Sequence, residues 1–333
     1  MTSISRRELC AGITAVGLAS ASGAARVAPA VDPTRTARHL ARITRDQYHD
    51  ARLGNRIGDQ LLAALRQGKL QSQSSEQLAE RLNAVVAAAS KDAHFVIMAG
   101  AMAHLPPVPP TEPHAETPPF NARELEFLRR RNFGIGTAGI LAGNIGYLQI
   151  PEQFFRPAAE LRQRLALAMG FLADTNGLIV DLTTTYGGDP KSVALYLSYF
   201  FDRAPFVLNS FRWRDLPVQE FMTSRDAGGP HYGERRPVAV LVSKSTVSAP
   251  EEFAYDMKAL KRGIIVGERT AGAANHALPV QLEGGFTAFI PKARAENPVT
   301  GTNWEGVGVE PDIVASPPHV EAARKALVER ISS

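Results

Sequence analysis

Serines at one strand-to-helix junction have the setting that acyl-transfer chemistry needs. The segment "KSTVSAPEEFAYDM" (244–257) follows the apolar run 237–243, a pattern typical of a buried strand that leads into a helix. The first backbone N–H groups of a helix have no partners within the helix. A serine at this junction is therefore either a helix N-cap, which is the commoner role, or a nucleophile whose oxyanion these N–H groups stabilise.

Three other segments carry groups that would complete such a site. Gly187-Gly188 follows a second apolar run and suits a tight turn or a close backbone approach. His94 closes a helical region, where a histidine is a cap, a packed side chain or a base. Glu305 lies in a stretch rich in glycine and aromatic residues. A nucleophile, a base and an orienting carboxylate form a triad by geometry, in any sequence order.

Other chemistries have little support in the sequence. The eight histidines show no metal-ligand spacing, so we expect neither a metal nor a cofactor. The pattern Gly134-x-Gly136-x-x-Gly139 follows the basic stretch 129–131 rather than a strand and opens no helix, which indicates a chance match or a β-turn. The G-x-S-x-G elbow of α/β-hydrolases is absent.

Composition indicates a globular protein. The 333 residues are 44% hydrophobic and 21% charged, and the formal net charge is +4. No long Lys/Arg run predicts nucleic-acid binding. The single cysteine, Cys10, lies in the N-terminal segment, so the rest of the chain has no thiol nucleophile and no disulfide.

Residues 1–30 read as a signal peptide of the twin-arginine type. Arg6-Arg7 precedes the uncharged, Gly/Ala-rich stretch 10–25, and Ala28-Pro29-Ala30 provides an A-x-A cleavage site. We therefore expect a bacterial protein in the periplasm or secreted. Beyond this segment no apolar run approaches the ~18 residues of a membrane span.

The rest of the chain divides by pattern into a helical part and an α/β part. Residues 31–104 form the expected helical N-terminal subdomain, with helical periodicity over 38–100 and a capping box at Ser74-x-x-Gln77. Residues 105–133 form a proline-rich linker. Residues 134–333 alternate short β-like runs with helical stretches, which predicts an α/β domain with partly parallel strands. The β-like runs are 145–150, 178–182, 238–242 and 264–266, and the helical stretches are near 156–173, 190–201 and 249–261.

Five segments together resemble a known family. They are "KDAHF", "GNIGYLQI", "LIVDLTTTYGGDP", "STVSAPEEFAYDMKALKRGIIVGERTAGAAN" and "NPVTGTNWEGVGVEPDI", within residues 45–315. They are similar to the C-terminal processing (tail-specific) serine peptidases, in the branch of interphotoreceptor retinoid-binding protein and the tricorn protease core. The resemblance implies a crotonase-like ββα core, a polypeptide substrate and Ser248 as nucleophile.

The resemblance also assigns the base and the oxyanion hole. The processing-peptidase branch uses a lysine 25 residues beyond its serine, where this chain has Ala273. The tricorn-like branch uses a histidine and a glutamate, which correspond to His94 and Glu305. Ala249 N–H, with that of Gly187 or Gly188, would bind the oxyanion. His49 is the first alternative base.

The chain departs from the family pattern at several positions. Thr183 and Thr185 replace an arginine and an asparagine before the two glycines, and Ala93 replaces a serine before the histidine. The interval between His94 and Gly143 leaves no room for a PDZ-like domain. The alternative function is a non-catalytic module that binds a retinoid- or lipid-type ligand on the same fold.

Overall fold

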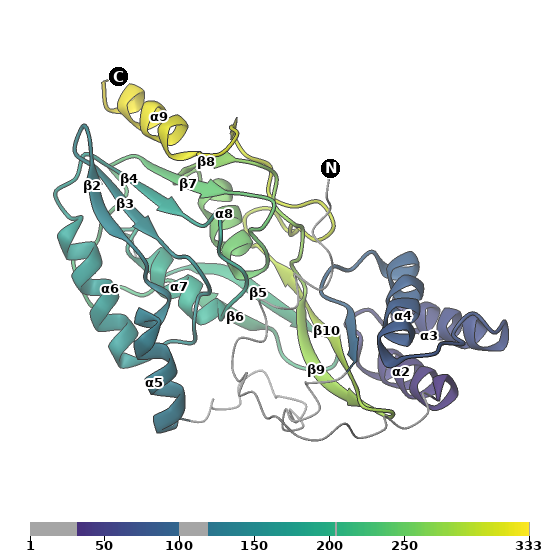
Figure 1. Cartoon of the computed structure of the whole chain (residues 1–333). Helices are drawn as coiled ribbons and strands as arrows, with labels where there is room; N and C mark the ends of the chain where they lie inside the picture. The colour runs from purple at the N-terminus through teal and green to yellow at the C-terminus, as the bar shows by residue number, and fades with distance from the viewer. Residues whose placement is uncertain (1–31, 100–118, 204, 333) are drawn as a thin grey trace.

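The computed structural model describes residues 32–99, 119–203 and 205–332 (Figure 1). The expected signal peptide and residues 105–118 of the expected linker lie outside these residues. No helix in the described ranges is long and apolar enough to cross a membrane.

Three N-terminal helices pack together beside the rest of the molecule (Figure 1). They are α2 (Pro33–Gln47), α3 (Ala51–Arg66) and α4 (Ser75–Ser90). The expected cap at Ser74 is confirmed, since the Gln77 N–H donates to its Oγ at 3.2 Å. The helical prediction was wrong at its end: α4 stops at Lys91, whose φ is 56°, and Val96–Ala99 forms strand β1. A left-handed residue at this position terminates a helix.

A six-stranded sheet forms the centre of the α/β part, in the order β11-β8-β7-β4-β3-β2. Its bounds are β2 (Ala138–Leu141), β3 (Ile145–Gln149), β4 (Gly177–Asp181), β7 (Val238–Val242), β8 (Ile264–Gly267) and β11 (Ile313–Val314). Every neighbouring pair is parallel except β2 with β3. The four predicted apolar runs are thus strands of one mainly parallel sheet, and the α/β fold is confirmed.

Helices cover both faces of this sheet. Alternate residues of β4, such as Leu178 and Val180, pack with α6 (Ala159–Phe171), α7 (Pro190–Ser198) and α8 (Ala249–Ala259) in the largest apolar core. The residue between them, Ile179, faces α9 (Val320–Ser332) on the other side. Burial on both faces explains why these strands read as continuous apolar runs.

A second, antiparallel sheet was not predicted. Its order is β1-β10-β5-β6, and β9 also pairs with β10. The strands are β5 (Val207–Trp213), β6 (Gln219–Met222), β9 (His276–Leu282) and β10 (Phe286–Glu296). The N-terminal helices pack on β9 and β10, with Leu40, Ile57 and Phe286 in their shared core. Through β1 this sheet brings the N-terminal part of the chain beside residues from its C-terminal third.

The described half of the segment expected as a linker is ordered into helices. Helix α5 (Ala122–Arg130) begins with a capping box between Asn121 and Glu124, and a 3₁₀ turn, η2 (Asn132–Gly134), follows. The glycines of the pattern at 134–139 run from this turn into β2 and open no helix, as expected for a match unrelated to nucleotide binding.

Candidate active site

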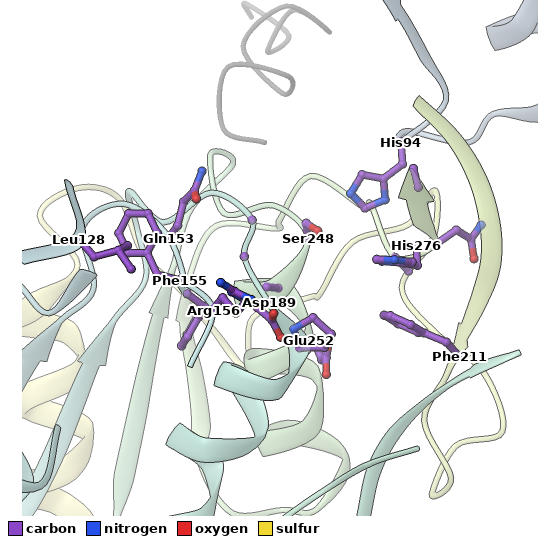
Figure 2. Close-up of a pocket in the computed structure, with 18 of the residues that line it drawn as sticks. His94, Leu128, Gln153, Phe155, Arg156, Asp189, Phe211, Ser248, Glu252 and His276 are labelled. Atoms are coloured by element: carbon purple, nitrogen blue, oxygen red, sulfur yellow. The ribbon is translucent and has the colours of Figure 1, made fainter. Parts of the chain in front are cut away.

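Ser248 lies at the turn between β7 and α8. Its φ of 71° and ψ of −122° are rare for a residue with a side chain, and residues in such conformations cluster at functional sites. Ser248 lines a pocket of about 560 Å³ (Figure 2). The neighbouring Ser245 is exposed at the surface. Of these two serines at the junction, Ser248 is the one placed at the pocket.

The Glu251 carboxylate fixes this turn. Its Oε2 accepts hydrogen bonds from the N–H groups of Ser248 (2.8 Å) and Ala273 (2.9 Å). Its Oε1 accepts from the Gly272 N–H (2.6 Å) and the Thr270 hydroxyl (2.5 Å). Burial raises the pKa of Glu251 to about 7, and the four donors act in the opposite direction. Glu251 therefore ties the start of α8 to the loop after β8.

The two glycines after β4 differ in their contacts. The Gly187 N–H donates to the Val247 carbonyl at 2.8 Å, so it is occupied by the turn that carries Ser248. Gly188 has a φ of 140°, and a Cβ there would collide with the Phe154 carbonyl. Gly188 and Ala249 both line the pocket. Of these two candidate oxyanion-hole glycines, only Gly187 donates its N–H to Val247, and Gly188 does not.

The threonines that depart from the family pattern have partners of their own. The Thr183 hydroxyl donates to Asp181 Oδ1 at 2.6 Å, and the Tyr147 hydroxyl donates to the other oxygen at 2.5 Å. The Thr185 hydroxyl donates to the Ile150 carbonyl. The loop that leads to the glycines is thus supported by hydrogen bonds without an arginine or an asparagine.

His94 lies between α4 and β1, and its buried imidazole lines the same pocket as Ser248 (Figure 2). Its backbone N–H donates to Asp92 Oδ1 at 3.0 Å. Burial lowers the pKa of His94, while the charge of Asp92 and a backbone hydrogen bond at Asn275 act against this. The imidazole is therefore neutral at pH 7, the form that accepts a proton.

Asp92 anchors the segment that carries His94, a role that the sequence reasoning missed. Its Oδ2 accepts hydrogen bonds from the Tyr48 hydroxyl and the Asn275 amide, both at 3.0 Å. The alternative base, His49, has its Nε2 4.0 Å from the same oxygen and lines a different pocket, beside Trp213. The structure therefore places His94, and not His49, at the pocket of Ser248.

Glu305 binds the backbone of two segments near His94. Its Oε1 accepts from the Ala93 N–H at 2.9 Å. Its Oε2 accepts from the N–H groups of Ala274 (2.7 Å) and Asn275 (2.9 Å). Burial and the neighbouring charge of Asp92 raise the pKa of Glu305, and the three backbone donors oppose this. Glu305 is close to the base, but its hydrogen bonds in the described structure are to backbone groups.

The pocket contains further polar residues that were not selected as candidates from the sequence. His276, at the start of β9, stacks on Phe211 with 4.6 Å between ring centroids, and burial lowers its pKa to about 4. Glu252 lies one helical turn after Ser248, and Asp189 caps α7 by accepting from the Lys191 N–H at 2.8 Å. Sequence signals existed for two acids: Ser248-x-x-Glu251 has the spacing of a capping box, and Asp189 precedes Pro190 as an N-cap precedes the first helical residue.

The described ranges contain no group of three or more His, Cys, Asp or Glu side chains that could hold a metal ion. Ala273, which stands where processing peptidases have lysine, is fully buried and contributes its N–H to Glu251.

Comparison with known families identifies the family to which this α/β fold, with a serine at its strand-to-helix turn, belongs. The model of "Peptidase family S41" matches residues 144–315, more than half of the chain. The chain belongs to this family.

Two curated relatives are chloroplast proteins. The C-terminal processing peptidase of Tetradesmus obliquus is 32% identical over 143 residues, which are 42% of this chain and 29% of that protein. Carboxyl-terminal-processing peptidase 2 of Arabidopsis thaliana is 26% identical over 178 residues, 53% of this chain and 32% of that protein. The matches thus span about a third of each relative's length.

Solved structures share the fold at low sequence identity. A protein from Parabacteroides merdae superimposes with a TM-score of 0.63 at 17% identity, covering 89% of this chain and 96% of that one. The tricorn protease gives 0.58 at 15% identity, covering 90% and 37%. The photosystem II D1 C-terminal processing protease gives 0.53 at 14% identity, covering 91% and 98%.

The role of Glu251 is testable by the substitution Glu251→Gln. An amide nitrogen in place of either oxygen faces two of the four donors, at least one of them a backbone N–H, so we expect a loss of about 2–4 kcal/mol in the free energy of unfolding. Urea denaturation measures it. The control is Glu268→Gln, which removes an ion pair with the exposed Lys244 and should cost less than about 0.5 kcal/mol. Equal stabilities for the two variants would contradict the anchoring role.

Proposed function

We propose that the chain is an exported serine peptidase in which Ser248 is the nucleophile and His94 the general base. One observation carries the proposal: a serine in a strained turn at a helix N-terminus shares one pocket with a buried histidine. That pairing suits proton transfer from a hydroxyl to an imidazole. Membership of a peptidase family makes a polypeptide the expected substrate.

In the proposed reaction, His94 removes the Ser248 proton as Oγ attacks the peptide carbonyl carbon. The N–H groups of Ala249 and Gly188 stabilise the negative charge on the carbonyl oxygen. His94 then gives the proton to the leaving amine, and the C–N bond breaks. Water, activated by the same imidazole, attacks the acyl-enzyme and releases the acid.

Glu305 is a positioning residue in this proposal. Its carboxylate holds Ala93, which precedes His94, and Asn275, whose backbone interacts with the imidazole. The glutamate that the resemblance assigns to orienting the base would thus act through the backbone. Its negative charge, when present, would also favour the imidazolium that forms during catalysis.

A second candidate function is the binding of an apolar ligand without catalysis. The observation that favours it is the pocket wall, which includes five phenylalanines and Trp304; the phenylalanines are Phe120, Phe127, Phe154, Phe155 and Phe211. A cavity of about 560 Å³ is within the range that holds small ligands. Such a module would not need a reactive serine.

Covalent labelling with a fluorophosphonate separates the two functions, because the probe reacts only with an activated serine. We expect labelling of the native protein, none of Ser248→Ala, and a rate lower by a factor of about 10³ in His94→Ala. His49→Ala is the matched control and should label at the native rate. A native protein that stays unlabelled while binding an apolar fluorophore would favour the second candidate.

The substitution Glu305→Gln tests the positioning role. Its amide cannot accept all three backbone N–H groups, so the segments around His94 should loosen. We expect a labelling rate at least about tenfold lower, together with a lower melting temperature. Glu310→Gln, in an exposed ion pair with Arg269, is the control. If Glu305→Gln matched that control in both measurements, Glu305 would have no part in the site.

Export is proposed from the sequence alone, on Arg6-Arg7 and Ala28-Pro29-Ala30. Intact-mass analysis of protein from the periplasm or medium of a bacterial host should give a mature N-terminus near Val31. Full-length protein that remains in the cytoplasm would refute this part of the proposal.

A further inference from the structure

Glu252 is a buried carboxyl group that the proposed mechanism does not use. It lies in the first turn of α8, four residues after Ser248, and both residues line the pocket (Figure 2). Only 4% of the residue is exposed, and its Oε1 has no hydrogen-bond partner among the described residues. A buried acceptor without a donor is costly, so this oxygen is suited to a donor that arrives with a ligand.

The charges around Glu252 have the same sign as its own. Burial raises its pKa well above the usual range, and the carboxylates of Asp256 and Asp189 add to this, while the Asn209 amide opposes it. Asp189 also lines the pocket. Arg156 lines it too, but its guanidinium lies 3.7 Å from the Phe120 ring centroid, and its charge acts on Asp189 rather than on Glu252.

The pocket combines this acidic side with apolar walls. Phe154 and Phe211 line it together with Trp304. Lysine and arginine pack an aliphatic stem along apolar surface while the charged end reaches polar groups. A cationic end would supply the donor that Oε1 lacks and would favour the ionised form of Glu252, which burial and the neighbouring acids disfavour.

We propose that this pocket binds a lysine or arginine side chain of the polypeptide substrate next to the bond that Ser248 cleaves, with Glu252 as the residue that selects it. The proposal deepens the proposed peptidase function and rests on it. The aromatic residues would hold the stem, and Glu252 would hold the charged end.

The test compares two peptides that differ at one residue before the cleaved bond, lysine in one and norleucine in the other. Norleucine keeps the linear stem and lacks the ammonium group. We expect kcat/KM for the lysine peptide to exceed that for the norleucine peptide by about tenfold or more, as a charged hydrogen bond would give. Equal values would overturn the proposal.

Two variants assign the preference to Glu252. Glu252→Leu should bring the lysine-to-norleucine ratio to about one, and its melting temperature should change little, because removal of a costly buried acid offsets the loss of its contact with the Asn209 amide. Asp256→Asn is the matched control. It removes a neighbouring acid that does not line the pocket and keeps an acceptor for the Asn297 amide, now 2.8 Å from Asp256 Oδ1. The control should keep the preference; a ratio unchanged in Glu252→Leu would refute the assignment.

Binding to Ser248→Ala distinguishes this proposal from the peptidase function. Calorimetry with the two peptides reads the pocket without turnover. Tighter binding of the lysine peptide, with no hydrolysis by the native protein, would uphold the pocket and reject the peptidase. Hydrolysis of both peptides at equal rates, with equal binding, would uphold the peptidase and reject the pocket.

Discussion

The rest of the site depends on the hydrogen bonds that the buried Glu251 carboxylate accepts. Two oxygens take three backbone N–H groups and one hydroxyl, from the start of α8 and from the loop after β8. A turn with the dihedral angles of Ser248 persists only where its surroundings determine it. Charge-assisted hydrogen bonds in a buried setting are strong enough to hold Ser248 in this conformation. The parallel sheet places the turn, and Glu251 determines its conformation.

A second set of contacts brings His94 to that turn from a distant part of the chain. Strand β1 pairs with β10, so the segment just before it, with His94, lies beside the C-terminal loops. Asp92 binds Tyr48 and Asn275, and Glu305 binds Ala93. The site therefore forms between the helical N-terminal part and the α/β part, and the antiparallel sheet positions one against the other.

Local patterns were enough to predict the elements that depend on nearby residues. The cap at Ser74 and the parallel strands around Leu178 followed from capping chemistry and from apolar runs. The long strands β9 and β10 were missed because their pairing joins residues far apart, and His276 was missed with them. Ser248 and His94 were recognised through family resemblance, since no local rule relates residues 154 positions apart. The acids Glu252 and Asp256 gave no signal, because burial of a carboxyl group is decided by tertiary packing.

The contact between Glu305 and Ala93 spans 212 residues of sequence. During synthesis the ribosome must release nearly the whole chain before the carboxylate reaches the segment that carries His94. A nascent chain can complete α2–α4, and even the strands β3, β4 and β7, while this contact is still missing. Delayed closure of this one long-range contact would thus leave the segment with His94 without its Glu305 anchor until synthesis is nearly complete.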